Sequence, residues 1–184
     1  MNRGILFAVV IALAWSGLTS GCRRAADTGQ LTTVDSLSYT MDKMLSTLMQ
    51  LDQHLYAVSD SVLKVHAENY SELFTDTLDR ATADALANQY LVLREAEHVE
   101  RDHLDLQREI SSTQQRLEDL RNDLNSGAMD NEAAHAAIAA ELQRASSVER
   151  ATALIASNHF TIKRTLEELS TTDPLRLRTL KDQK

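Results

Sequence analysis

Turn-forming residues are almost absent from the body of this chain. Residues 30–126 contain neither glycine nor proline, and Pro174 is the single proline of the sequence. Sandwiches, barrels and doubly wound sheets reverse direction many times and need such residues at their turns. A body without them favours long helices, and we therefore predict an all-α fold.

The first predicted helix, residues 33–67, carries an apolar seam with heptad spacing. Its ten seam positions are Val34, Leu37, Met41, Met44, Leu48, Leu51, Leu55, Val58, Val62 and Val65. A seam sustained over more than four heptads is typical of a coiled coil, and Thr33 is a suitable N-cap. The apolar stripe changes phase over residues 66–72, which predicts either a tight turn or a kink in one continuous helix.

Two further helices are predicted over residues 71–125 and 130–171. The seam of the former reads Val92, Ala96, Val99, His103, Leu106, Ile110, Thr113, Leu117, Leu120 and Leu124. The seam of the latter reads Ala134, Ile138, Ala145, Val148, Thr152, Ile155, His159, Ile162, Leu166 and Leu169. Gly127 supplies the left-handed residue that ends one helix, Asp130 caps the next, and Pro174 terminates it.

These two seams agree on one pairing register. In the antiparallel hairpin that a short turn at Gly127 creates, the numbers of facing residues add up to about 255. Thr113 then faces Glu141 in a polar layer, which we expect to be solvated and slightly splayed. We predict an elongated three-helix, coiled-coil-like bundle over residues 31–172, in which the first helix folds back along the second near the N-terminal end of the second.

Residues 1–21 have the organisation of a secretory signal peptide. Arg3 supplies the positive start, and residues 5–15 form an unbroken apolar run. This run of about eleven residues is too short to cross a bilayer core, which takes roughly twenty. Small and polar residues follow at 16–21, directly before Cys22, the single cysteine of the chain.

The segment Thr19-Ser20-Gly21-Cys22 resembles the lipobox of bacterial lipoproteins, whose usual form is Leu-Ala/Ser-Gly/Ala-Cys. It departs from that form at Thr19, where leucine is commonest. The resemblance covers the first 22 residues and implies cleavage between Gly21 and Cys22, a diacylglyceryl thioether on the Cys22 sulfur and acylation of the freed amine, with palmitate as a typical chain. The alternative is an ordinary cleavage site followed by an incidental thiol.

Lipidation would place the mature chain in the bacterial cell envelope. Two or more acyl chains hold a protein stably to a bilayer, whereas one holds it weakly. Residues 22–30 would then form the lipidated cysteine and a short polar tether. Arg23 rather than aspartate follows the cysteine, which in enteric-type lipoproteins implies the outer membrane, facing the periplasm.

The charge of the body argues against nucleic acid as a partner. The formal net charge of −8 becomes −9 when Arg3 is removed with the signal peptide, and no basic stripe concentrates the lysine and arginine residues. A nucleic-acid-binding surface needs such a stripe. We expect the partners to be the lipid bilayer, through acylated Cys22, and either a protein partner or a second copy, through the helical seams.

Two Glu-x-x-His pairs, Glu95/His98 and Glu132/His135, are the patterns most suggestive of metal chemistry. Such pairs bind two metal ions in ferritin-like bundles when they lie level with one another. The register separates these pairs by about 30 Å along the bundle, so we predict no metal site and no cofactor.

His103 and His159 occupy seam positions about 10 Å apart in level, where we expect tolerated core residues rather than ligands or a pH switch. The sequence has no glycine-rich phosphate loop and no nucleophile–base set, and we predict that the protein is not an enzyme. Met41, Met44 and Met49 are interpreted as seam filler rather than as an adaptable binding groove.

The function expected from these features is that of a membrane-anchored, extracytoplasmic lipoprotein with a structural or protein-interaction role. One alternative is attachment to the cell wall through Lys184, at the end of the tail formed by residues 173–184. In its lipid anchor, helical body and terminal lysine the chain resembles lipoproteins that are covalently joined to peptidoglycan, although it is much longer. A second alternative is a metal- or small-molecule-binding bundle using the histidines at positions 98, 103, 135 and 159.

Overall fold

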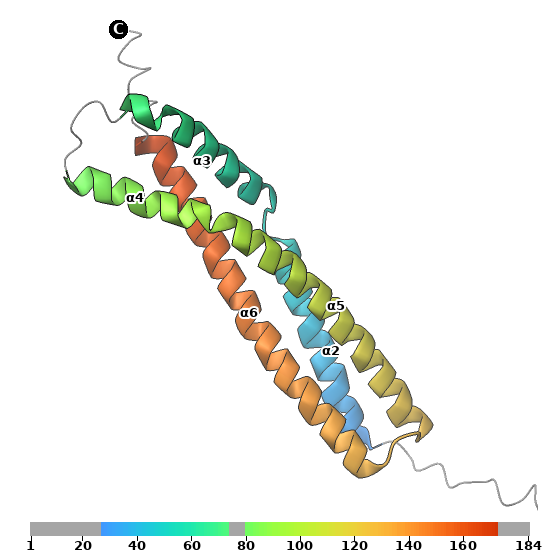
Figure 1. Cartoon of the computed structure of the whole chain (residues 1–184). Helices are drawn as coiled ribbons and strands as arrows, with labels where there is room; N and C mark the ends of the chain where they lie inside the picture. Colours follow the sequence, from blue (N-terminus) through green and yellow to red (C-terminus); the bar gives the residue numbers. More distant parts are fainter. Residues whose placement is uncertain (1–26, 74–79, 173–184) are drawn as a thin grey trace, which may run out of the picture.

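The computed structural model describes residues 27–73 and 80–172, which form an elongated bundle of helices (Figure 1). Its elements are α2 (Thr28–Met49), α3 (His54–Leu73), α4 (Arg80–Arg94), α5 (Ala96–Ser126) and α6 (Asn131–Thr172). No strand occurs in these two ranges. The predicted all-α bundle is confirmed, and α6, with 42 residues, extends about 63 Å along it.

The hairpin between α5 and α6 turns where the sequence predicts. Gly127 adopts a φ of 67°, and its N–H donates to the carbonyl of Leu124 at 3.3 Å, while the N–H of Ala128 donates to the carbonyl of Asp123 at 3.0 Å. These bonds satisfy carbonyl groups at the helix end that have no partner within the helix. Asp130 caps α6, because its Oδ1 accepts a hydrogen bond from the backbone N–H of Ala133 at 2.8 Å.

The seams of this hairpin are confirmed almost completely. All predicted positions from Ala96 to Leu124 on α5 are buried, and Val92 is half-buried. All predicted positions on α6 are buried except Leu166, which is half-buried and packs against the core. The Arg116 side chain reaches Glu141 across the hairpin, in agreement with the predicted register.

The prediction of one helix over residues 33–67 is wrong, because the chain is interrupted at residues 50–53. α2 begins earlier than expected, at Thr28, where Asp27 Oδ1 accepts from the N–H of Gly29 at 2.8 Å, so Thr33 is not the N-cap. α2 ends at Met49. The N–H of His54, at the start of α3, donates to Asp52 Oδ1 at 3.0 Å. An aspartate capping the following helix gives a local reason for the break.

The tight turn predicted at residues 66–72 is also wrong, because α3 is helical throughout that stretch. The chain therefore reverses later, between α3 and α4, and residues 74–79 lie outside the described ranges. As a result α2 packs beside the C-terminal part of α5 rather than near its N-terminal end (Figure 1). Asp35 Oδ1 pairs with Arg121 Nε at 3.1 Å, which fixes that position.

The helix predicted over residues 71–125 begins later than expected, at Arg80, and is present from there as α4 and α5, which follow one another with a single-residue interruption at Glu95. Helical hydrogen bonding continues on both sides of it, from the N–H of Glu95 to Leu91 and from the N–H of Val99 to Glu95. Within the described ranges, no helix is both long and apolar enough to cross a membrane.

Candidate functional site

A buried cluster of polar rings lies at the break between α2 and α3. Tyr56 of α3 packs between His103 of α5 and His159 of α6, and all three side chains are buried. The tyrosine ring meets each imidazole edge to face, with centroids 6.0 Å away for His103 and 5.9 Å away for His159. Three helices thus contribute to one layer, which we call the ring layer.

Hydrogen bonds give each imidazole of the ring layer a defined role. His159 Nε2 donates to the backbone carbonyl of Asp52 at 3.1 Å, and this carbonyl also accepts from the N–H of Leu55 at 3.3 Å, so the imidazole links α6 to the helix break. His103 Nδ1 lies 3.2 Å from Tyr56 Oη, and His103 Nε2 lies 3.2 Å from the side-chain nitrogen of Gln107. The tautomer that suits both contacts carries its proton on Nδ1, because the Gln107 amide then donates to Nε2.

Burial favours the neutral forms of His103 and Tyr56. The pKa of His103 is lowered from 6.5, chiefly because burial removes water from the imidazolium; the nearby backbone carbonyl of Leu48 opposes the shift, and His159 adds to it. The pKa of Tyr56 is raised to about 12, first by burial and then by the charge of Glu100. Tyr56 and His103 are therefore uncharged at neutral pH, and protonating His103 would disturb its hydrogen bonds.

The two histidines belong to one cluster that the sequence register does not predict. We expected His103 and His159 to be separate core residues about 10 Å apart in level, but Tyr56 joins them into one layer. Sequence reasoning missed Tyr56 because a single helix over residues 33–67 places it beside the apolar seam rather than on it. The signal that could have found it is Asp52, a good N-cap inside an otherwise unbroken heptad repeat.

A second polar layer, formed by Thr113, Arg116, Glu141 and Arg144, lies nearer the Gly127 turn. The prediction of a solvated, splayed pair is wrong, since Thr113 is fully buried and Glu141 is 6% exposed. Arg116 donates from Nε to Glu141 Oε1 at 3.3 Å and from Nη2 to Thr113 Oγ1 at 2.7 Å, and Arg144 also donates to Glu141 Oε1. Glu141 Oε2 has no hydrogen-bond partner among the described residues.

The remaining histidine candidates are not gathered into a site. His98 is exposed and contacts the Arg101 guanidinium through Nδ1 at 2.6 Å, and His135 is exposed on α6. Within residues 27–73 and 80–172, no group of three or more His, Cys, Asp or Glu side chains is placed to hold a metal ion. Met41 and Met44 are core residues of α2, whereas Met49 is exposed.

The residues predicted to carry the lipid anchor, Gly21 and Cys22, lie outside the described ranges, as does Lys184. No protein-family model matches this chain, and neither the curated proteins nor the solved structures gave a match.

Proposed function

We propose that this protein is a bacterial envelope lipoprotein in which acylated Cys22 holds a helical rod to a membrane and the far end of the rod meets a protein partner. The observation that carries the proposal is the position of Cys22. It follows the small residues Ser20 and Gly21 and stands six positions before Thr28, the first residue of α2. A stretch of six residues spans at most about 20 Å, so the anchor would lie close to the bundle.

The short spacing between Cys22 and α2 indicates which end of the rod would face the membrane. α2 begins beside the start of α6, where Gln30 Nε2 donates to Asn131 Oδ1 at 2.9 Å. The end containing the Gly127 turn would therefore lie next to the membrane. α3 and the C-terminal half of α6 form the opposite end, about 60 Å away along α6. A rod of this kind suits a spacer or adaptor that presents a surface away from the bilayer.

The anchor is tested by labelling cells with a palmitate analogue and comparing the wild-type chain with Cys22→Ala. We expect label and membrane association in the wild type and the loss of both in the variant. Ser20→Ala is the matched control, because alanine keeps the small residue that the lipobox uses and should leave the label in place. An unlabelled wild-type protein with an unmodified Cys22 in mass spectra would refute the proposal.

A second candidate, attachment to peptidoglycan through Lys184, is favoured by the direction of α6. This helix carries the chain from the proposed membrane end at Asn131 to the opposite end at Thr172. Muramidase digestion of purified cell wall should then release peptides from residues 175–184 linked to a wall fragment. Their absence, with the protein present in the membrane, would exclude this role and leave the anchor proposal intact.

A further inference from the structure

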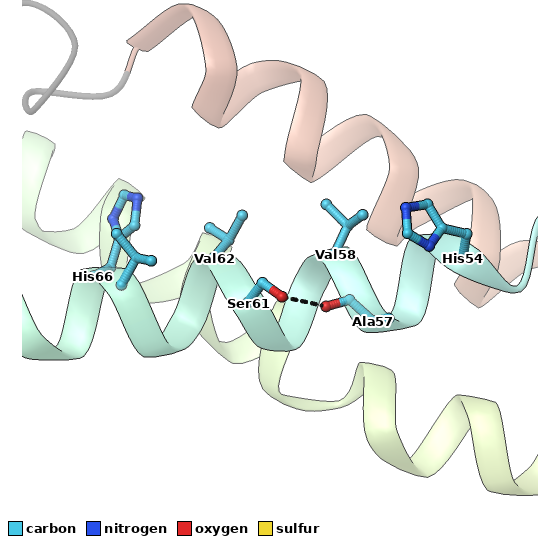
Figure 2. A pocket seen from close by; sticks show the side chains of 7 residues that line it. His54, Ala57, Val58, Ser61, Val62 and His66 are labelled. Carbon is cyan, nitrogen blue, oxygen red and sulfur yellow. Dashed lines mark hydrogen bonds between the residues drawn. The ribbon is translucent and has the colours of Figure 1, made fainter.

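The helix α3 carries an apolar stripe that the bundle leaves partly uncovered. Its inward face buries Tyr56, Ser59 and His66. The stripe itself, Val58, Val62 and Val65, continues the heptad spacing of α2, yet Val65 is 51% exposed and the other two are half-buried. Figure 2 shows Val58 and Val62 projecting from the same side of α3. They line an open groove of about 420 Å³, together with His54, Ala57, Ser61, Val65 and His66.

The groove contains no lysine, arginine, aspartate or glutamate among its lining residues. The charged residues between its turns, Asp60 and Lys64, pair with each other at 2.5 Å, and both are largely exposed. An apolar stripe with heptad spacing and without like charges is self-complementary, because nothing on it repels an identical stripe. These features suit a second copy of the same helix.

We propose that α3 packs against α3 of a second copy, in parallel, through Val58, Val62 and Val65. This inference rests on the proposed lipid anchor. Two copies held in one leaflet by Cys22 point the same way, and a twofold axis along the rods sets each stripe position against its own counterpart. The heptad repeat of the chain thus serves two interfaces: its α2 part is buried within the bundle, and its α3 part lies between copies.

Another occupant from the same chain, the segment 173–184, suits the groove less well. That segment carries four basic residues, Arg176, Arg178, Lys181 and Lys184, against two acidic ones, Asp173 and Asp182. Bringing this excess of positive charge to a groove lined by no carboxylate would desolvate cations without supplying partners for them.

The size of the stripe predicts that the dimer depends on the membrane. The stripe from Val58 to Val65 spans eight residues and is about 12 Å long, which is short for a stable interface of roughly 1,200 Å² or more. Anchoring two copies in one leaflet raises their effective concentration and strengthens a weak contact without new interactions. The lipidated protein should therefore pair, whereas the unanchored body should remain monomeric at micromolar concentration.

The test is disulfide formation in membranes from cells that express the full chain with Val65→Cys. Acylated Cys22 has no free thiol, so the introduced cysteine would be the only reactive one. Leu142→Cys is the matched control, because Leu142 is 48% exposed on α6 and lies off the groove. Mild oxidation should convert most of the Val65→Cys protein to a covalent dimer and at least fivefold less of the control. Adding Val58→Asp should abolish the dimer while circular dichroism shows an intact fold.

Each other outcome overturns the inference in a distinguishable way. A monomeric Val65→Cys protein whose Cys22 resists maleimide would refute pairing and leave the anchor standing. Equal dimer formation by the control would indicate collision rather than an interface. A maleimide-reactive Cys22 would refute the anchor and, with it, the pairing of copies in a shared leaflet. An intramolecular disulfide between Val65→Cys and Leu177→Cys would assign the groove to the C-terminal segment.

Discussion

In the half of the bundle next to the Gly127 turn, the apolar heptad seam predicted from the sequence of α2 is buried. Five of its heptad positions, Val34, Leu37, Met41, Met44 and Leu48, are buried against α5 and α6. In the other half, α3 continues the same repeat, but it turns Tyr56, Ser59 and His66 inward and leaves Val65 half exposed. The difference teaches that a heptad repeat specifies spacing along a helix, while the direction in which the helix enters the bundle decides which face is buried.

The interruption at residues 50–53 is the physical cause of this difference. A helix that stops and restarts need not keep its rotational phase, so α3 is free to present a face one position away from the seam. The backbone groups released at the break need partners. The carbonyl of Asp52 accepts from the N–H of Leu55 and from His159 Nε2, and the latter bond ties the ring layer to the change of phase.

The largest expected effect on the free energy of unfolding comes from comparing valine-to-alanine substitutions at one seam position in each half of the bundle. Val34→Ala, at a fully buried position, should lower the free energy of unfolding by about 2 kcal/mol, through lost apolar burial and the cavity left behind. Val65→Ala, at a half-exposed position, should change it by less than about 0.5 kcal/mol in the unanchored body. Urea unfolding followed by circular dichroism measures both values. Equal losses would mean that the stripe on α3 is part of the intramolecular core.

The α5–α6 hairpin could be predicted from the sequence because each of its rules is local. Gly127 and Asp130 mark the turn by their backbone preferences, and the seams from Ala96 to Leu124 and from Ala134 to Leu169 follow one period. The fate of the first helix could not be predicted in this way. Leu51 and Leu55 continue the repeat across the break, so the apolar pattern concealed it, and only the capping preference of Asp52 pointed to it. The ring layer depends on that break, so it could not be predicted without predicting the break.

The two polar layers of the bundle differ in charge, and Glu141→Leu tests whether the charged one stabilises the fold. Replacing Glu141 removes a buried carboxylate whose Oε2 is unpartnered among the described residues. The side chains of Arg116 and Arg144 are 38% and 47% exposed and can turn to solvent. Replacing buried ion pairs by apolar residues is often neutral or stabilising, so we expect a gain of up to about 1 kcal/mol. Thermal unfolding measures it.

Glu141→Gln is the control for that substitution, because it keeps the shape of the side chain but removes its charge. It should be less stable than Glu141→Leu, since it leaves two guanidinium groups beside a neutral, still polar group. If the leucine variant instead lost more than about 2 kcal/mol, the charged layer would be a net source of stability.

In the ring layer, Tyr56→Phe should have a smaller effect, a loss of about 1 kcal/mol. Phenylalanine preserves the edge-to-face packing on both imidazoles but removes the oxygen that His103 Nδ1 contacts at 3.2 Å. Urea unfolding at neutral pH measures the loss, and Tyr39→Phe, at a residue that is 71% exposed, is the matched control with no expected change. A loss as large as that of Val34→Ala would mean that the hydroxyl organises the break itself.

Near neutral pH, the smallest expected effect is a dependence of stability on pH that belongs to the ring layer. The folded bundle binds a proton at His103 less readily than the unfolded chain, because burial lowers the pKa of His103 from 6.5. The unfolded state then holds more protons as the pH falls below about 6.5, so the free energy of unfolding should decline there.

Tyr56 gives the opposite slope at high pH. Its pKa is raised from 10.0 to about 12 in the fold, so the unfolded chain loses this proton first and stability should decline above about pH 10. Urea unfolding between pH 5 and pH 11 measures both branches. His103→Gln should flatten the acid branch relative to the wild type, and Tyr56→Phe the alkaline one. If neither substitution changed its branch, the slopes would arise from charged groups outside the ring layer. The helix break would then be held by packing alone, and the contrast between the two halves of the bundle would be one of geometry rather than of titrating groups.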